Sequence, residues 1–172
     1  KVLVNEMTST LATIARDVKV QIEFNPAVVK EYRQIGYENR QLNREDFNND
    51  KVDAGEIGAG QTITALYEVA LTTNLSAGPY AQFDFRYKKP GESQSRLLQH
   101  SINSSPKQMA QASENMRFAA SLTAFGLIMK QSAHKGTADK QMVLNLGATA
   151  KTFDPNGYRS QFIDIVNKWK PD

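Results

Sequence analysis

The chain has 172 residues, of which 40% are hydrophobic and 23% are charged, as in an ordinary globular domain. No stretch approaches 18 consecutive apolar residues, which excludes a predicted membrane span, and the absence of cysteine excludes disulfides and thiolate metal sites within these residues. The net charge of +3 comes from scattered basic residues, so a solvated surface is favoured over a nucleic-acid-binding face and no nucleic-acid partner is expected.

The first 16 residues are expected to form a helix. Apolar residues recur there at helical spacing, namely at Leu3, Met7, Leu11 and Ile14. The chain starts without an initiating methionine, and we interpret it as a fragment of a longer protein whose targeting signal would lie upstream.

Five β-strands are expected in a β-rich part that covers residues 17–103. The clearest is 18–24, where apolar and polar residues alternate. The other expected strands are 28–37, 62–71, 82–88 and 96–102. A proline–glycine turn at 89–93 should make the last two an antiparallel hairpin. Short turns and polar alternate faces predict an antiparallel, sandwich-like sheet region.

Helices are expected in the remaining part, residues 104–172. Ser105, Pro106 and Gln108 have the pattern of a helix N-terminus, which predicts a helix to about residue 131. The fold class predicted for the chain is therefore α+β. We expect the helical part to pack on the β-rich part as a single structural unit.

Two shorter helices are expected to follow. Thr137 can cap one of them and Gly147 would close it, while Asp154 and Pro155 would start the last. The last helix has apolar residues at helical spacing, which are Tyr158, Phe162, Ile165, Val166 and Trp169. Such a stripe is more typical of a core than of a ligand site.

The polar block between residues 39 and 51 is the first candidate for a site. Asp46, Asn48 and Asp50 have the 1-3-5 spacing of a calcium loop, whose oxygens converge on one ion. However, Lys51 stands where that loop needs glycine, and Ile57 stands where it needs a bidentate glutamate. We therefore favour a solvated loop with local hydrogen bonds and keep a calcium-stabilised module as the alternative.

The glycines after this block are expected to mark turns. Gly55, Gly58 and Gly60 superficially resemble a phosphate-binding loop, but such a loop opens a helix and carries a lysine at a fixed offset. Here a strand follows, and no lysine stands at that offset. A turn that leads into the strand is the favoured interpretation.

The remaining candidates for chemistry are weak. The two histidines, His100 and His134, cannot form a metal site by their spacing. The carboxylates of Glu45, Asp46 and Asp50 leave an enzyme of undetected type as a further alternative. We assign no catalytic residue, no cofactor and no metal ligand beyond the calcium candidate above.

Several runs of residues carry a resemblance. They are 17–26, 35–40, 46–51, 53–60, 64–68, 117–120, 125–126 and 157–159. Together they resemble a domain of unknown function that lies C-terminal to a von Willebrand factor type A domain in bacterial envelope-associated proteins. The resemblance covers nearly the whole chain, and it would make residues 1–16 the linker helix that leaves the type A domain.

This resemblance implies a non-catalytic interaction or scaffolding domain. Its implied partners are its own upstream type A domain and another envelope protein. Type A domains bind ligands through an Asp-x-Ser-x-Ser motif, which this chain lacks, so that activity is not carried over. Members of the family resemble exported lipoproteins, which implies a periplasmic or other extracytoplasmic location in the cell envelope.

Overall fold

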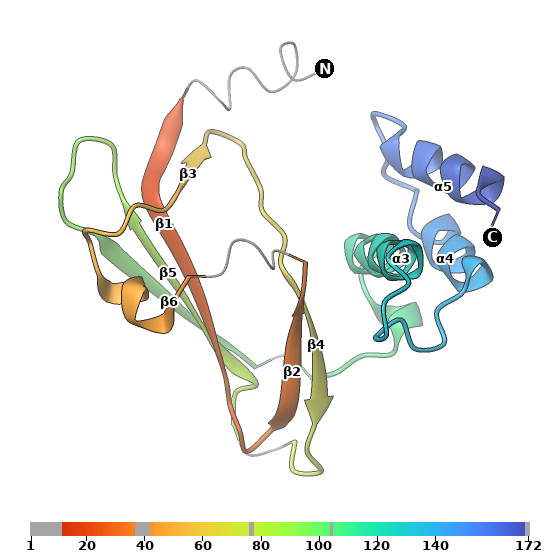
Figure 1. Cartoon of the computed structure of the whole chain (residues 1–172), viewed down its shortest axis with the longest axis horizontal. Coiled ribbons are helices and arrows are strands. Elements are labelled where there is room, and N and C mark those ends of the chain that lie inside the picture. Colours follow the sequence, from red (N-terminus) through yellow and green to blue (C-terminus); the bar gives the residue numbers. More distant parts are fainter. Residues whose placement is uncertain (1–11, 37–41, 76–77, 104, 171–172) are drawn as a thin grey trace. The chain divides into compact units, whose positions relative to one another are not determined.

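The computed structural model in Figure 1 describes residues 12–36, 42–75, 78–103 and 105–170. It divides into two compact units, Lys1–Ser104 and Ser105–Asp172. The first unit contains antiparallel β-strands and the second contains helices, which confirms the α+β class. The predicted packing of the helical part on the sheet stays a prediction.

The described strands of the first unit form two antiparallel sheets (Figure 1). The larger sheet has the order β3-β1-β5-β6. Its strands are β1 (Thr13–Phe24), β3 (Gly55–Gly58), β5 (Ala81–Lys88) and β6 (Arg96–Ile102). In the smaller sheet, β2 (Val29–Ile35) pairs with β4 (Leu66–Leu71).

The start of β1 corrects the expected N-terminal helix. Residues 1–11 lie outside the described residues, but the strand already begins at Thr13, so the helix prediction is wrong for 13–16. Pairing with β3 supplies the reason, because Thr13 lies opposite Gly58 and Ala15 lies opposite Ile57. Sheet pairing thus overrides a short helical pattern.

The glycine segment is also corrected. Residues Gly55–Gly58 form β3 and not a turn, although Gly60 does have the expected positive φ, at 76°. The expected strand 62–71 is shorter than predicted and starts at Leu66.

A bulge interrupts β1 at Asp17. Arg16 lies opposite Lys88 and Lys19 lies opposite Arg86, so β1 has one residue more than β5 over this interval. Asp17 itself has a φ of 48°, a left-handed conformation that aspartate tolerates better than most residues. Because residues opposite one another share a face, the bulge brings both Arg16 and Lys19 to the face of Arg86 and Lys88.

The larger sheet has one polar and one apolar face, as the alternation predicts. The polar face carries Lys19, Gln21 and Glu23 of β1 and Gln82, Asp84, Arg86 and Lys88 of β5. On the opposite face, Val20 lies opposite Phe85, and Phe85 lies opposite Leu98 of β6. We call these three residues the apolar row.

The smaller sheet covers one end of the apolar face. The ring of Phe24, at the end of β1, lies 4.5 Å from that of Tyr32 on β2 and 5.4 Å from that of Tyr67 on β4. These contacts make the first unit sandwich-like at its Phe24 end. The opposite end of the face keeps exposed apolar side chains at Val20 and Leu98.

The helical unit consists of α3 (Glu114–Met129), α4 (Lys140–Ala148) and α5 (Tyr158–Lys168) in its described part. Its buried centre contains Ala124, Val143 and Val166, one residue from each helix. The ring of Phe125 meets those of Phe162 and Trp169 edge-on, at 5.7 and 5.4 Å. Such edge-to-face contacts are a favoured aromatic geometry in cores.

The predicted apolar stripe of α5 is only partly buried. Val166 is buried and Phe162 and Trp169 are partly buried, but Tyr158 and Ile165 are exposed. Ile163 is buried in their place. A short helix against few neighbours buries a narrow face, so the outer residues of the stripe stay exposed.

The helix starts differ from the predicted ones. Ser105 does not begin α3; a 3-10 helix, η3 (Met109–Gln111), comes first, and Ser113 caps α3 by accepting a hydrogen bond from the backbone N–H of Met116. Asp139 replaces Thr137 as the cap of α4.

The end of α4 and the start of α5 also differ. Gly147 lies inside α4, one residue before its end, and not after the helix. The last helix starts at Tyr158 and not at Asp154 and Pro155, although the Asp154 carboxylate accepts hydrogen bonds from the backbone N–H groups of Arg159 and Ser160. No helix of the described residues is both long and apolar enough for a membrane crossing.

Candidate functional site

The polar block lies against the polar face of the larger sheet. Residues Arg44–Asn48 form a 3-10 helix, η2, whose Phe47 is buried while most of its neighbours are exposed. Figure 1 shows η2 beside the larger sheet. The expected solvated loop is therefore a loop that is held on the sheet through one buried aromatic side chain and several polar contacts.

Lys19 of β1 is the central contact. Its ammonium group donates hydrogen bonds to the backbone carbonyls of Asp46, at 3.1 Å, and Asn49. Lys19 is only 3% exposed. A buried charge is tolerated where polar groups replace its hydration, and the two carbonyl oxygens do so here.

The three calcium candidates contact three different donors. Asn48 Oδ1 accepts a hydrogen bond from Arg86 Nη2 at 2.8 Å, and Asp50 Oδ2 accepts one from the backbone N–H of Ser95 at 3.3 Å. The carboxylate of Asp46 accepts one from the Asn43 side chain at 3.2 Å. Within residues 12–36, 42–75, 78–103 and 105–170, no group of three or more histidines or carboxylates could hold a metal ion.

Lys88 connects the loop to the bulge. Its ammonium group donates to Asp17 Oδ2 and to the backbone carbonyl of Asp50, both at 2.8 Å. The hydrogen bond from Lys88 is the main reason that the pKa of Asp17 lies below its ordinary value of 3.8. The pKa of Asp50 is also lowered, chiefly by its hydrogen bonds from Ser95. Both carboxylates are therefore ionised at neutral pH.

Arg86 completes the attachment. Its guanidinium group donates to Ser95 Oγ at 2.6 Å and to Asn48, and it lies 5.6 Å from the ring centre of Phe47. A guanidinium over an aromatic ring adds a cation–π attraction. We call the sheet residues Asp17, Lys19, Arg86 and Lys88 the loop anchor.

The loop anchor was not predicted from the sequence. Its residues alternate with apolar ones and were expected to face solvent. One sequence pattern could have indicated the anchor. Three cations, at positions 19, 86 and 88, lie on the polar sides of two predicted strands, and the chain also contains an Asp- and Asn-rich block to which they could bind. Arg86 and Lys88 both bind the protein's own loop.

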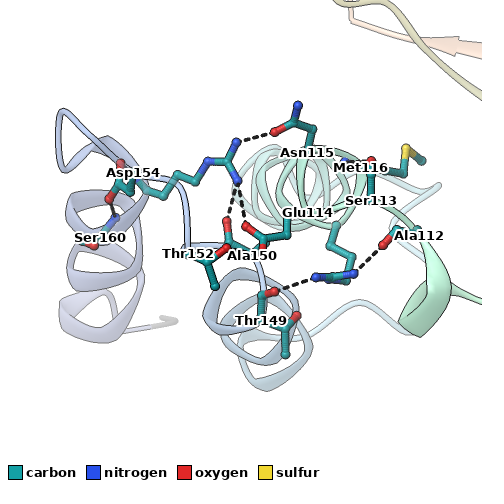
Figure 2. A network of polar contacts seen from close by, with 12 residues as sticks. Ala112, Ser113, Glu114, Asn115, Met116, Thr149, Ala150, Thr152, Asp154 and Ser160 are labelled. Carbon is teal, nitrogen blue, oxygen red and sulfur yellow. Dashed lines mark hydrogen bonds and ion pairs between the residues drawn. The ribbon is translucent and has the colours of Figure 1, made fainter.

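A second polar network lies in the helical unit and is shown in Figure 2. Arg117 of α3 donates to the backbone carbonyls of Ala112 and, at 2.8 Å, Thr149. Arg159 of α5 donates to the carbonyl of Ala150 at 2.6 Å. Carbonyls at a helix C-terminus lack partners within the helix, so the two arginines stabilise the end of α4.

Arg159 also contacts the start of α3. It donates to Asn115 Oδ1, and its guanidinium carbon lies 5.0 Å from the ring centre of Phe118. Glu114 accepts a hydrogen bond from the Thr152 hydroxyl, which is the main cause of its lowered pKa. Two runs that carry the family resemblance, 117–120 and 157–159, thus meet in this network, since Arg159 lies over Phe118.

The other candidate residues do not join either network. His100 lies exposed on β6 and His134 lies exposed in the turn after α3. Glu45 is exposed on η2. A shallow hollow near the β5–β6 turn is lined by six consecutive residues, Gly91 to Arg96, so it is a property of one turn.

The carboxyl groups with shifted pKa values bear on whether the protein could use acid–base chemistry. In Asp154, desolvation alone would raise the pKa, but hydrogen bonds from Ser160 and Arg159 outweigh this effect and the pKa is lowered. The carboxyl groups whose pKa is shifted in the described residues, Asp17, Asp50, Glu114 and Asp154, are therefore all shifted downward. A carboxylic acid that serves as a general acid near neutral pH needs a raised pKa. These four groups instead act as ionised hydrogen-bond acceptors.

Comparison with known proteins places the chain in a family. The family model described as "Uncharacterized protein YfbK, C-terminal" matches residues 9–171. The chain is 41% identical, over 184 aligned positions, to "Uncharacterized protein YfbK" of Escherichia coli (strain K12). That alignment covers 96% of the chain and 32% of the relative, so the chain spans about a third of the relative's length.

No solved structure matches the chain. The family match spans both units, and it confirms the resemblance to a bacterial C-terminal domain. The chain belongs to the family of the YfbK C-terminal region.

Proposed function

We propose that this chain is a non-catalytic interaction or scaffolding domain that supports an upstream von Willebrand factor type A domain in the bacterial cell envelope. The observation that carries this proposal is the apolar row of the larger sheet. Its two outer members are exposed, with Val20 at 50% and Leu98 at 56%. Aligned apolar side chains left open on a sheet are typical of a surface that binds another protein.

The use of the charged residues supports a structural role. The three cations of the loop anchor donate hydrogen bonds to the loop 44–50. The two arginines of the helical unit donate hydrogen bonds to carbonyls at the end of α4. The carboxylates in these networks have lowered pKa values, which suits them to hold hydrogen bonds and not to exchange protons near neutral pH.

The greater length of the E. coli relative supports the presence of a partner domain in the same protein. The chain corresponds to about a third of the E. coli relative, so that protein has further chain that could hold a partner domain. The type A identity of that partner and the envelope location rest on the resemblance in the residue runs named above. Fractionation of cells that produce the tagged full-length protein tests the location, and recovery in the cytosol alone would contradict it.

Calorimetry tests the interaction. The 172-residue chain is titrated with the separately produced upstream part of its full-length protein, and measurable binding is expected. Val20→Lys should weaken binding strongly, because it puts a charge into the apolar row. Leu122→Lys is the matched control, since Leu122 is also exposed, at 51%, but lies on α3 of the helical unit. No binding of the wild-type chain, or equal loss in both variants, would overturn the proposal.

A further inference from the structure

The outer edge of β6 is a second surface, distinct from the sheet face. β6 is the last strand in the order β3-β1-β5-β6 and pairs with β5 along one side. Along the other side of an edge strand, backbone N–H and C=O groups have no partner within the sheet. Such an edge can accept a strand of another chain unless its sequence or shape prevents this.

The other edges of the first unit carry features that discourage pairing. β3 has four residues, and two register shifts interrupt its pairing with β1. The smaller sheet has a register shift near its start and charged residues along both strands, which are Lys30, Glu31, Arg33 and Glu68. Short, irregular or charged edges are the common means by which proteins avoid unwanted strand pairing.

β6 has none of these features. It pairs with β5 through seven consecutive residues without a register shift, and it contains no proline, glycine or carboxylate. Its one permanently charged residue, Arg96, is already paired with Glu92 of the same chain, at 2.7 and 3.0 Å. The edge strand is therefore regular and exposed over most of its length, and the charge of its arginine is balanced by Glu92.

The apolar row ends at this edge. Leu98 is its last member, and Leu97 is also exposed on the other side of the same strand. A strand added beyond β6 with an apolar residue opposite Leu98 would extend the row by one position. Cross-strand apolar pairs of this kind stabilise sheets.

We propose that a second copy of this chain occupies the edge, with the two β6 strands antiparallel across a two-fold axis at Leu98. Two-fold pairing sets the same surface against itself, so each Leu98 side chain meets its counterpart and the two apolar rows become continuous. Leu97 then lies opposite Gln99. The internal pairing of Arg96 with Glu92 removes the repulsion that two like-charged strands would otherwise suffer.

This proposal goes beyond the proposed function, because it adds pairing along the backbone edge of β6 to the contacts that the apolar row can make. With the axis at Leu98, only residues 96–100 of each β6 lie opposite the other strand, and this contact is smaller than the roughly 800 Å² per partner of a standard interface. The dimer should therefore be weak, and its population should rise with protein concentration by mass action.

Sedimentation velocity of the 172-residue chain over a wide concentration range tests the proposal. The wild-type chain should shift from monomer to dimer as concentration rises. Leu98→Lys and Leu98→Glu should each stay monomeric, because like charges then meet across the axis. An equal mixture of the two variants should form a heterodimer, which native mass spectrometry identifies. Recovery of a dimer in the mixture shows that both Leu98 variants are folded.

Val20→Lys is the matched control for the edge. Val20 lies in the same row at a similar exposure, but it is two strands away from the edge. This variant should dimerise like the wild-type chain even where it loses the upstream partner, so the two proposals fail separately. Hydrogen exchange gives a second readout on the unaltered chain, since backbone amides of β6 should gain protection as concentration rises.

A wild-type chain that stays monomeric at every concentration would overturn the proposal. So would a dimer that persists in both Leu98 variants, because another surface would then hold it. β6 amides that show the same exchange in monomer and dimer would count equally against it.

Discussion

The ammonium group of Lys19 donates a hydrogen bond to the backbone carbonyl of Asp46, 3.1 Å away and 27 residues further along the chain. Together with its bond to the Asn49 carbonyl, this contact supplies a positive charge to carbonyl oxygens of the loop that first suggested a calcium site. The loop is thereby joined to β1 by the protein's own cation. Several measurable consequences follow from this and from related contacts.

Lys19→Met should detach the loop from the sheet. The change keeps the aliphatic part of the side chain but leaves two carbonyls without their donor. Hydrogen bonds to charged groups contribute about 1.5–3 kcal/mol each, so unfolding in urea should show a loss of about 2 kcal/mol or more. Hydrogen exchange should be faster in residues 44–52 than in the wild-type chain.

Lys30→Met is the control for this substitution. Lys30 is exposed on β2, and its ion pair with Glu31 joins two exposed side chains. Exposed pairs contribute about 0–1 kcal/mol. Unchanged exchange of the loop in Lys19→Met would show that Lys19 does not hold it.

Calcium should leave the melting temperature unchanged. The side chains of Asp46, Asn48 and Asp50 bind three different donors within the protein. An ion would have to displace these bonds before it could be bound. Thermal melts at increasing calcium, with magnesium as the comparison, measure this directly. A rise that corresponds to about 2.7 kcal/mol, the effect of a ligand at 100 times its Kd, would instead support the calcium-stabilised alternative.

Asp17→Asn should lower stability at neutral pH but not in acid. The folded pKa of Asp17 lies below 3.8 because Lys88 donates a hydrogen bond to the ionised carboxylate. A lowered folded pKa contributes stability above the unfolded pKa, and this contribution is lost as pH falls through the folded pKa. The difference in unfolding free energy between the two proteins should therefore be constant from about pH 7 to about pH 5 and shrink below about pH 4.

The choice of asparagine isolates the charge. Asparagine tolerates the positive φ of Asp17, whereas Asp17→Ala adds backbone strain to the lost ion pair and should be less stable at every pH. A difference between wild type and Asp17→Asn that stays constant down to about pH 2 would rule out the ionised pair as its cause.

Gly147→Ala should destabilise the helical unit. An added Cβ would lie 2.1 Å from Ile163 Cδ1 and 3.2 Å from Ser121 Oγ. Both neighbours are buried, so α5 has to shift or Ile163 has to change its rotamer. Overpacking of this kind costs about 1–3 kcal/mol. Urea unfolding followed by the fluorescence of Trp169, which lies in this unit, measures the loss.

Two further variants sharpen the last test. Ile163→Val removes the Cδ1 atom, so the double variant should lose less stability than the sum of the two single changes. Gly126→Ala is the matched control on α3, where nothing lies within 4 Å of the added Cβ. It should stabilise the helix by about 0.5–1 kcal/mol. Equal losses at both glycines would contradict the close approach of α4 and α5.

Local patterns were sufficient for most of the secondary structure. Alternation predicted β1 from residue 18 and also β5, and the turn at 89–93 predicted β6 as the return strand; the bounds of β5 and β6 agree closely with the structure. The helical part was predicted by its 3.6-residue period, although its caps were not. Ser105 has a capping pattern, yet Ser113 caps α3, because several candidate caps compete along the chain and tertiary contacts select one.

The sequence by itself determined the α+β class, the two faces of the larger sheet and, through matching runs, the family. Only the tertiary structure decided that the Asp-rich block is held by Lys19, Arg86 and Lys88. The physical reason is that periodicity reports which side of a strand a residue takes. The partner of a buried ammonium group depends on a bulge at Asp17 and on pairing between segments far apart in the chain.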